Sequence, residues 1–326
     1  MHFLTDPLVG LALSHFDAIE IEQADRFFST FGPGNLINAT DRPHERFNDY
    51  ETLLSLLRER NRQKYEQVHK GTPFFFLAWL AFDLRNYEKA LYYLDAAISE
   101  DVKNAGPRWI NLPGALFLKL TTQRHVAERV IEQIRTLLVE QLDRFNSISN
   151  LSAISLDGFI DRFVTRLMQD PSTRTIMSAL YIFFLEYKER QIELCLRSTE
   201  GSSLGPIIAH LFSGGLIFES LLKNLYPTKN NGNQNKTLGD IIFHTTPFES
   251  DFGTGVQTRA DTLLEILDAV NDNSLLTAFC TTSRIRNTTG HNLVWDNIFN
   301  TSEKYEILSN QIINAIFYVI EKKFLR

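Results

Sequence analysis

Two residues near the C-terminal end of the sequence could carry out acid–base and electrostatic chemistry together. Arg286 carries a permanent charge, and its planar guanidinium matches the geometry of phosphate oxygens. His291, five positions later, can exchange a proton near neutral pH. Such a pair suits a phosphodiester, because the charge on the phosphate rises in the transition state and protons must move. We therefore expect phosphodiester chemistry that needs no metal ion and no other cofactor.

Spacing alone does not single out this pair. Three Arg–His pairs in the sequence have four to six intervening residues, and Arg62 with His69 is one of them. Arg62 lies in a charge-rich stretch, where a solvated helix face accounts for it. Arg286 instead follows apolar residues and emerges from a helix expected to be buried. Because residues five apart in an unbroken helix point about 140° apart, we expect Gly290 and the three helix-poor residues before it to break the helix.

Helical periodicity extends over almost the whole sequence, and no alternating strand pattern is evident. Apolar residues recur at helical spacing over 50–65, 126–145, 173–197, 206–225, 263–270, 275–286 and 302–323. We therefore expect an all-α fold. The Gly214–Gly215 pair inside one predicted helix lowers helix propensity, which favours close approach of another backbone there. His210, on the apolar face of the same helix, is expected to be a packed or hydrogen-bonded residue rather than a catalyst.

One segment of the first half, residues 74–100, resembles a tetratricopeptide repeat (TPR). Small alanines, such as Ala78, Ala90 and Ala97, stand where the two helices of such a unit touch. No second unit follows or precedes it in register, and repeat arrays need about three units to bury their faces. The segment is therefore either one degenerate unit or an ordinary helical hairpin.

Two domains are expected. Residues 1–150 would form a helical, partly TPR-like domain for sensing or interaction. Residues 172–326 would form a helical bundle that contains Arg286 and His291. Between them, the small polar run that begins at Ser147 and the strong helix start at residues 170–172 mark the predicted boundary.

The C-terminal bundle resembles HEPN ribonucleases. The resemblance rests on the R-x4-H motif formed by Arg286 and His291, on the polar Asn287 that follows the arginine, and on the position of the motif before the last helix. Glu219 and Lys223 match an E-x3-K/R element found in some members. The stretch Thr-Leu-Gly-Asp-Ile-Ile that begins at residue 237 is also similar to segments of abortive-infection HEPN proteins.

This resemblance implies a metal-independent endoribonuclease. It would cut single-stranded RNA by attack of the 2′-OH, leave a 2′,3′-cyclic phosphate, and act as a toxin or antiviral defence effector. Arg286 would stabilise the transition state and His291 would transfer or position a proton. Asn287 would orient the phosphate or His291, Glu219 and Lys223 would support the site, and Arg284 would be a second phosphate contact. Because members of the family dimerise so that two motifs share one cleft, a homodimer with a composite active site is also implied.

A structural interpretation of the same residues stays open. Arg286 would then pair with a carboxylate and His291 would cap a helix, and the chain would be a non-catalytic helical scaffold for protein interaction and dimerisation. Cleavage of RNA in the presence of EDTA would distinguish the two functions.

Charge and composition limit the partners. The formal net charge of −6 argues against RNA binding by bulk attraction, so a local basic patch would be needed. Two cysteines, Cys195 and Cys280, are too few for a disulfide framework or a zinc cluster. No signal-peptide pattern and no apolar stretch of membrane-spanning length is evident. We therefore expect a cytoplasmic protein without a membrane partner. The resemblance to HEPN ribonucleases implies that the first domain would sense a signal, inhibit or recruit, and a regulatory or antitoxin protein is its candidate partner.

Overall fold

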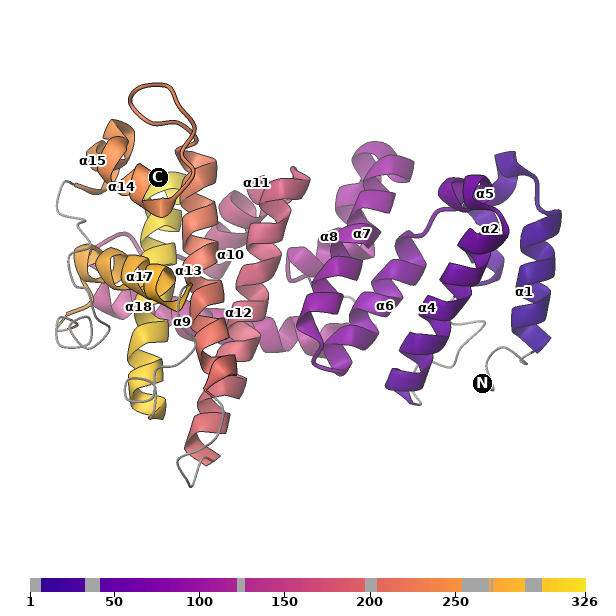
Figure 1. The fold of residues 1–326 in the computed structure, drawn as a ribbon, viewed down its shortest axis with the longest axis horizontal. Coiled ribbons are helices and arrows are strands. Elements are labelled where there is room, and N and C mark those ends of the chain that lie inside the picture. The colour runs from indigo at the N-terminus through magenta and orange to yellow at the C-terminus, as the bar shows by residue number, and fades with distance from the viewer. Residues whose placement is uncertain are drawn as a thin grey trace. The chain divides into compact units, whose positions relative to one another are not determined.

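The computed structural model describes residues 7–32, 42–121, 127–196, 204–253, 270, 272–290 and 301–326. Within these ranges the chain is helical and contains no strand, and an isolated antiparallel bridge joins Thr228 to Gln234 (Figure 1). The predicted all-α fold is confirmed. The chain divides into two compact units, Met1–Glu132 and Gln133–Arg326.

The first unit is a succession of helices in which α6 and α7 share the most extensive contact. In chain order the elements are α1 (Pro7–Ala18), η2 (Ile21–Arg26), α2 (Phe27–Thr30), α4 (Pro43–Arg60), α5 (Arg62–Gln67), α6 (Gly71–Asp83), α7 (Tyr87–Ala105), η3 (Gly106–Asn111) and α8 (Pro113–Leu118). A further helix, α9 (Glu128–Ile148), begins in this unit and continues into the second.

The α6–α7 hairpin forms at the segment that resembles a TPR unit. Three residues connect the helices, and Arg85 among them adopts a left-handed conformation with φ of 55°. Asn86 caps α7 by accepting a hydrogen bond from the backbone N–H of Lys89 (3.2 Å). Ala78, Ala90 and Ala97 are buried, as expected for small residues between two close helices.

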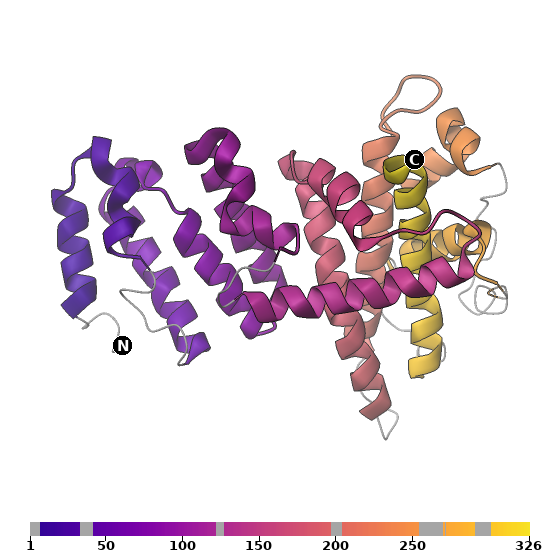
Figure 2. The ribbon, with the colours of Figure 1, turned by 180° about the vertical axis from the view of Figure 1, so that it is seen from behind.

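The second unit is a helical bundle. Its elements after α9 are α10 (Leu156–Gly158), the π-helix η4 (Phe159–Val164), α11 (Thr165–Leu167), α12 (Pro171–Leu196), α13 (Gly205–Leu225), α14 (Leu238–His244), α15 (Thr246–Phe252), α17 (Leu275–Thr289), α18 (Ser302–Ile320) and the π-helix η5 (Glu321–Leu325). Helices α12, α13 and α18 pack together, and α17 lies across α13 and α18 (Figures 1 and 2). The helix predicted over 263–270 lies outside the described residues except for Val270.

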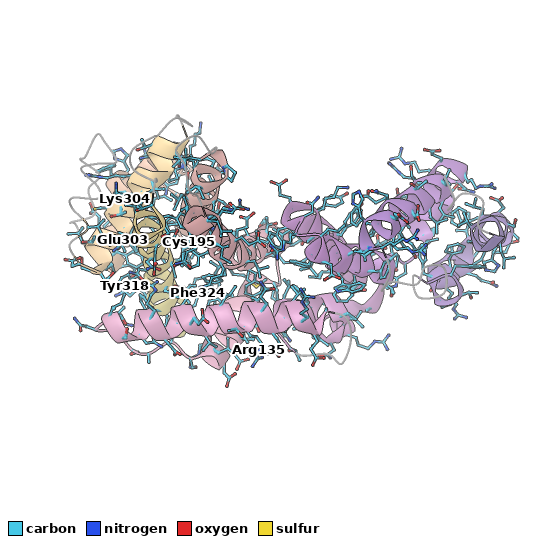
Figure 3. The ribbon with its side chains drawn as sticks, turned by 90° about the horizontal axis from the view of Figure 1, so that it is seen from below. Arg135, Cys195, Glu303, Lys304, Tyr318 and Phe324 are labelled. Atoms are coloured by element: carbon cyan, nitrogen blue, oxygen red, sulfur yellow. The ribbon has the colours of Figure 1, made fainter. Side chains whose placement is uncertain are left out.

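The division between the units differs from the predicted one. We expected it between residues 147 and 172, but it falls after Glu132. The reason is packing at the other end of α9, where Phe145 contacts Phe317 and Tyr318 at ring-centroid distances of 5.5 and 4.9 Å. Figure 3 shows α9 beside the C-terminal segment that carries Tyr318. The polar run after α9 is thus part of the second unit.

Helix α13 is the helix of the described residues that is long and apolar enough to cross a membrane, by length and composition alone. This differs from the expectation that no stretch of the sequence reaches that length. Packing accounts for its apolar character, because 61% of its most apolar window is buried within the structure. It packs against α12, α17 and α18.

Candidate functional site

Arg286 lies in the last turn of α17 and reaches α13. The side chain of Ser274 caps the start of α17 by accepting a hydrogen bond from the backbone N–H of Thr277 (3.2 Å). Arg286 Nε donates a hydrogen bond to Oε2 of Glu219 on α13. The Glu219 side chain is only 2% exposed, whereas that of Arg286 is 25% exposed. The arginine of the predicted motif is therefore paired with a buried carboxylate.

A second cation, Lys223, contacts the same carboxylate. Its Nζ lies 2.7 Å from Oε1 of Glu219, one turn earlier on α13. Glu219, Lys223 and Arg286, hereafter the Glu219 cluster, thus combine one negative charge with two positive ones. Both cations lie in the last turns of their helices, where the helix dipoles favour positive charge. The structure brings together three of the residues that the sequence singled out.

The guanidinium of Arg286 is held along one edge. Its Nε is bonded to Glu219, and within the described residues neither terminal nitrogen donates a hydrogen bond. Glu219 therefore orients the plane of the guanidinium, and no other residue of the described chain engages the two Nη groups. Those N–H groups match pairs of phosphate oxygens, and hydrogen bonds between charged partners are stronger than neutral ones.

Gly215 permits this contact between α13 and α17. A Cβ at this position would lie 2.7 Å from Cβ and 3.1 Å from Cα of Arg286. The predicted close approach of another backbone is confirmed at Gly215. At Gly214 the neighbours are side chains instead, since a Cβ there would lie 2.5 Å from Phe183 and 2.8 Å from Ile312.

Gly215→Ala should therefore destabilise the second unit and displace Arg286. Overpacking of this kind costs about 1–3 kcal/mol. Gly239→Ala on α14 is the matched control, because its Cβ would meet only ordinary contacts at 3.8 and 3.9 Å. Because alanine has a higher helix propensity than glycine, the Gly239→Ala variant should be as stable as the wild type or more stable by up to about 1 kcal/mol. Urea denaturation of both variants measures the difference, and equal stabilities would contradict the close approach at Gly215.

The helix ends before Gly290, as predicted, but the three helix-poor residues that precede the glycine do not break it. The three residues before Gly290 are helical, and Gly290 itself has helical angles (φ −68°, ψ −12°) with its N–H bonded to the Arg286 carbonyl (3.3 Å). The hydroxyls of Thr288 and Thr289 donate to carbonyls one turn earlier, at 2.8 and 2.6 Å. These bonds satisfy the hydroxyls within the helix, so the residues need not leave it. The helix ends at Thr289.

Three other predicted residues stand apart from the Glu219 cluster or outside the described chain. His291 lies outside the described residues, so its convergence with Arg286 stays a prediction. Asn287 is exposed in the last turn of α17. Arg284 is two positions before Arg286 in a continuous helix, which places their side chains about 160° apart. The structure therefore does not bring Arg284 to the cluster.

His210 is a buried structural residue, as the sequence predicted. Its Nδ1 accepts a hydrogen bond from the Tyr305 hydroxyl (2.8 Å), and its Nε2 donates to the Phe183 carbonyl (2.9 Å). The Phe183 ring stacks on the imidazole with centroids 4.1 Å apart. Burial lowers the pKa of His210 to about 3, so the folded protein keeps this side chain neutral.

The neutral state of His210 predicts a loss of stability in mild acid. Because the unfolded chain takes up a proton near pH 6.5 and the folded chain only near pH 3, stability falls as the pH drops between these values. The loss attributable to His210 should be about 2 kcal/mol between pH 7 and pH 5. His210→Gln, which does not titrate, should show a shallower pH dependence in urea unfolding. Equal slopes would show that the folded state protonates His210 as readily as the unfolded state does.

A groove that the sequence did not predict opens beside Lys223, between α12 and α13. Its α13 wall includes Ser213, Ser220 and Asn224, whose spacings of seven and four place them on one helix face. That periodicity was readable in the sequence. Small hydroxyl residues nevertheless carry little signal in a helix expected to be buried.

Searches of protein-family models, curated proteins and solved structures find no match to this chain. Among the described residues, no group of three or more His, Cys, Asp or Glu side chains is placed to hold a metal ion. The case for a function therefore rests on the residues of the Glu219 cluster, the groove beside it, and the motif that the sequence places at residues 286–291.

Proposed function

We propose that this chain is a metal-independent endoribonuclease that cleaves single-stranded RNA. The observation that carries the proposal is the geometry of Arg286, whose guanidinium is fixed through Nε by a buried carboxylate while both Nη groups lack partners within the described residues. A second cation on the same carboxylate adds positive charge. An RNA phosphate could dock on the Nη groups without disrupting the Glu219 pair.

In the proposed reaction the 2′-oxygen of RNA attacks the adjacent phosphorus and the bond from phosphorus to the 5′-oxygen breaks. The products are a 2′,3′-cyclic phosphate and a 5′-hydroxyl. Arg286, supported by Lys223, stabilises the extra charge of the pentacoordinate phosphorane. His291 transfers or positions a proton, since an imidazole side chain can exchange protons near neutral pH. Asn287 orients the phosphate or His291.

The resemblance to HEPN ribonucleases supports this proposal and extends it. Two copies of the chain would pair so that two Arg–His motifs share one cleft and supply both proton transfers. The first unit, with the α6–α7 hairpin as its TPR-like element, would sense a signal or bind a regulatory or antitoxin protein. The protein would act in the cytoplasm as a toxin or antiviral defence effector.

The proposal is tested by incubating the purified full chain with single-stranded RNA of mixed sequence in EDTA. Cleavage is expected to persist in EDTA and to yield 2′,3′-cyclic phosphate ends. DNA of the same sequence lacks the attacking 2′-OH and should stay intact. Cleavage that stops in EDTA and returns with a divalent metal ion, or cleavage of the DNA control, would contradict this mechanism.

A non-catalytic scaffold for protein interaction and dimerisation is the second candidate. The Arg286–Glu219 pair favours it, because the structural interpretation of the motif predicts that Arg286 pairs with a carboxylate. One cation is enough to neutralise Glu219, however, and the structure places two around it. No cleavage by the purified dimer would favour the scaffold.

A further inference from the structure

The groove between α12 and α13 has a volume of about 430 Å³ and is open to solvent. This volume lies within the range of about 300–1,000 Å³ that is usual for small-ligand sites. Its polar side chains come from both helices and are Ser172, Thr173, Thr175, Ser213, Ser220, Lys223 and Asn224. The groove therefore has room for a nucleotide-sized group between two walls that can form hydrogen bonds.

The groove is also lined by the apolar side chains of Ile176, Ala179, Leu216 and Ile217, and the polar groups among them suit a sugar phosphate rather than a base or a cation. No acidic and no aromatic side chain is among its described lining residues, and its charged residue is Lys223. Within the described part of the chain, the hydroxyls of Ser213 and Ser220 have no hydrogen-bond partner and remain available to a ligand. Hydroxyls and a lysine suit ribose and phosphate oxygens, whereas bases are usually held by stacking on aromatic rings.

The groove and the Glu219 cluster share Lys223. Lys223 lines the groove, and its Nζ also contacts Glu219, which holds Arg286. A phosphate on Arg286 would therefore lie close to the end of the groove at Lys223. The rest of the α13 wall extends from Asn224 back to Ser213, a rise of about 16 Å along the helix axis.

We propose that this groove binds the ribose–phosphate backbone of the RNA strand next to the phosphate that is cleaved. This inference rests on the proposed ribonuclease function and assigns the path of its substrate. Because no aromatic side chain lines the groove, binding there reads the backbone and not the base. RNA positions in the groove should accordingly show no base preference.

The test is a charge inserted on each wall of the groove. The variants Ser213→Glu on α13 and Thr175→Glu on α12 place a carboxylate where the backbone would run. Ser213→Gln is the neutral control of the same size. Asn231→Glu adds the same charge in the exposed loop after α13, away from the groove. All four are made in the His291→Ala background, so that the RNA is not consumed during the measurement.

Affinity for a fluorescein-labelled single-stranded RNA of mixed sequence is measured by anisotropy at 0.15 M salt. Both groove carboxylates should weaken binding about tenfold, the effect of a like charge at close range. Ser213→Gln should weaken it much less, and Asn231→Glu should bind like the parent. Thermal unfolding of each variant shows whether the fold is retained. Affinities equal to that of the parent for folded Ser213→Glu and Thr175→Glu would overturn the assignment of the groove.

The measurements distinguish an error in the inference about the groove from an error in the proposed function. If the wild type cleaves RNA while the groove variants bind it normally, the groove inference falls and the function stands. If the groove variants lose affinity but the wild type does not cleave, the function falls and the groove remains an RNA site. If the groove variants are monomers where the parent is a dimer, and their affinity for RNA is unchanged, the groove binds a second copy of the chain.

Discussion

Arg286→Ala is expected to lower the rate constant of RNA cleavage by about two to three orders of magnitude, the usual loss when one preorganised donor to a developing charge is removed. The physical reason is that the guanidinium is held by Glu219 before the substrate arrives, so no reorganisation is needed as the phosphate gains charge. Single-turnover cleavage at saturating enzyme measures this effect on the chemical step.

Arg286→Lys separates the shape of Arg286 from its charge, and two further variants serve for comparison. Arg286→Lys keeps a cation beside Glu219 but loses the planar fork, so most of the loss should remain. Lys188→Ala removes an exposed cation from α12 of the same unit and should cleave at the wild-type rate. His291→Ala should also impair cleavage, because it removes the group that exchanges protons. Wild-type cleavage by both Arg286→Ala and His291→Ala would remove these residues from the active site.

Removing both cations from Glu219 should produce the largest loss of stability. The Glu219 carboxylate is 2% exposed, and Arg286 and Lys223 are its two ion-pair partners in the described chain. Either Arg286→Met or Lys223→Met leaves the other cation in place. The double variant leaves a buried charge without compensation, which costs about 3–5 kcal/mol. The double variant should therefore lose more than the sum of the two single losses.

A third substitution checks the cause. Adding Glu219→Leu to the double variant removes the buried charge, so the triple variant should be more stable than the double. Urea denaturation with a shared slope gives the free energies of unfolding of the wild type, the two single variants, the double variant and the triple variant. The stability losses of the two single variants could instead add up to that of the double variant, and Glu219→Leu could lower stability further. That result would show that the buried Glu219 carboxylate does not need these cations to neutralise it.

Much of the helical architecture was predictable from local patterns. Apolar periodicity indicated the extent of α12 and α13 nearly to their ends. Pro171 and Pro206 marked where the two helices begin, because proline is favourable in the first turn of a helix. Glu219 and Lys223 were predictable as neighbours, because residues four apart lie on the same helix face. Local patterns did not predict the division after Glu132, because it depends on the rings that Phe145 of α9 meets in α18.

The continuation of α17 through Thr289 was also beyond the sequence. Asn287, Thr288 and Thr289 are poor helix formers by intrinsic propensity. In the structure Thr289 is buried, and the two threonine hydroxyls bond to carbonyls within the helix. Propensity is a weak prior that such packing overrides, so these three residues stay helical and the helix ends only before Gly290.

By itself the sequence determined that the chain is helical and which residues could act on a phosphodiester, because helix hydrogen bonds and contacts between residues four apart are local. Only the tertiary structure decided that Arg286 shares a buried carboxylate with Lys223. Glu219 and Arg286 are 67 positions apart. They meet because Gly215 has no Cβ to keep α17 away from α13, and that contact depends on the packing of the whole bundle.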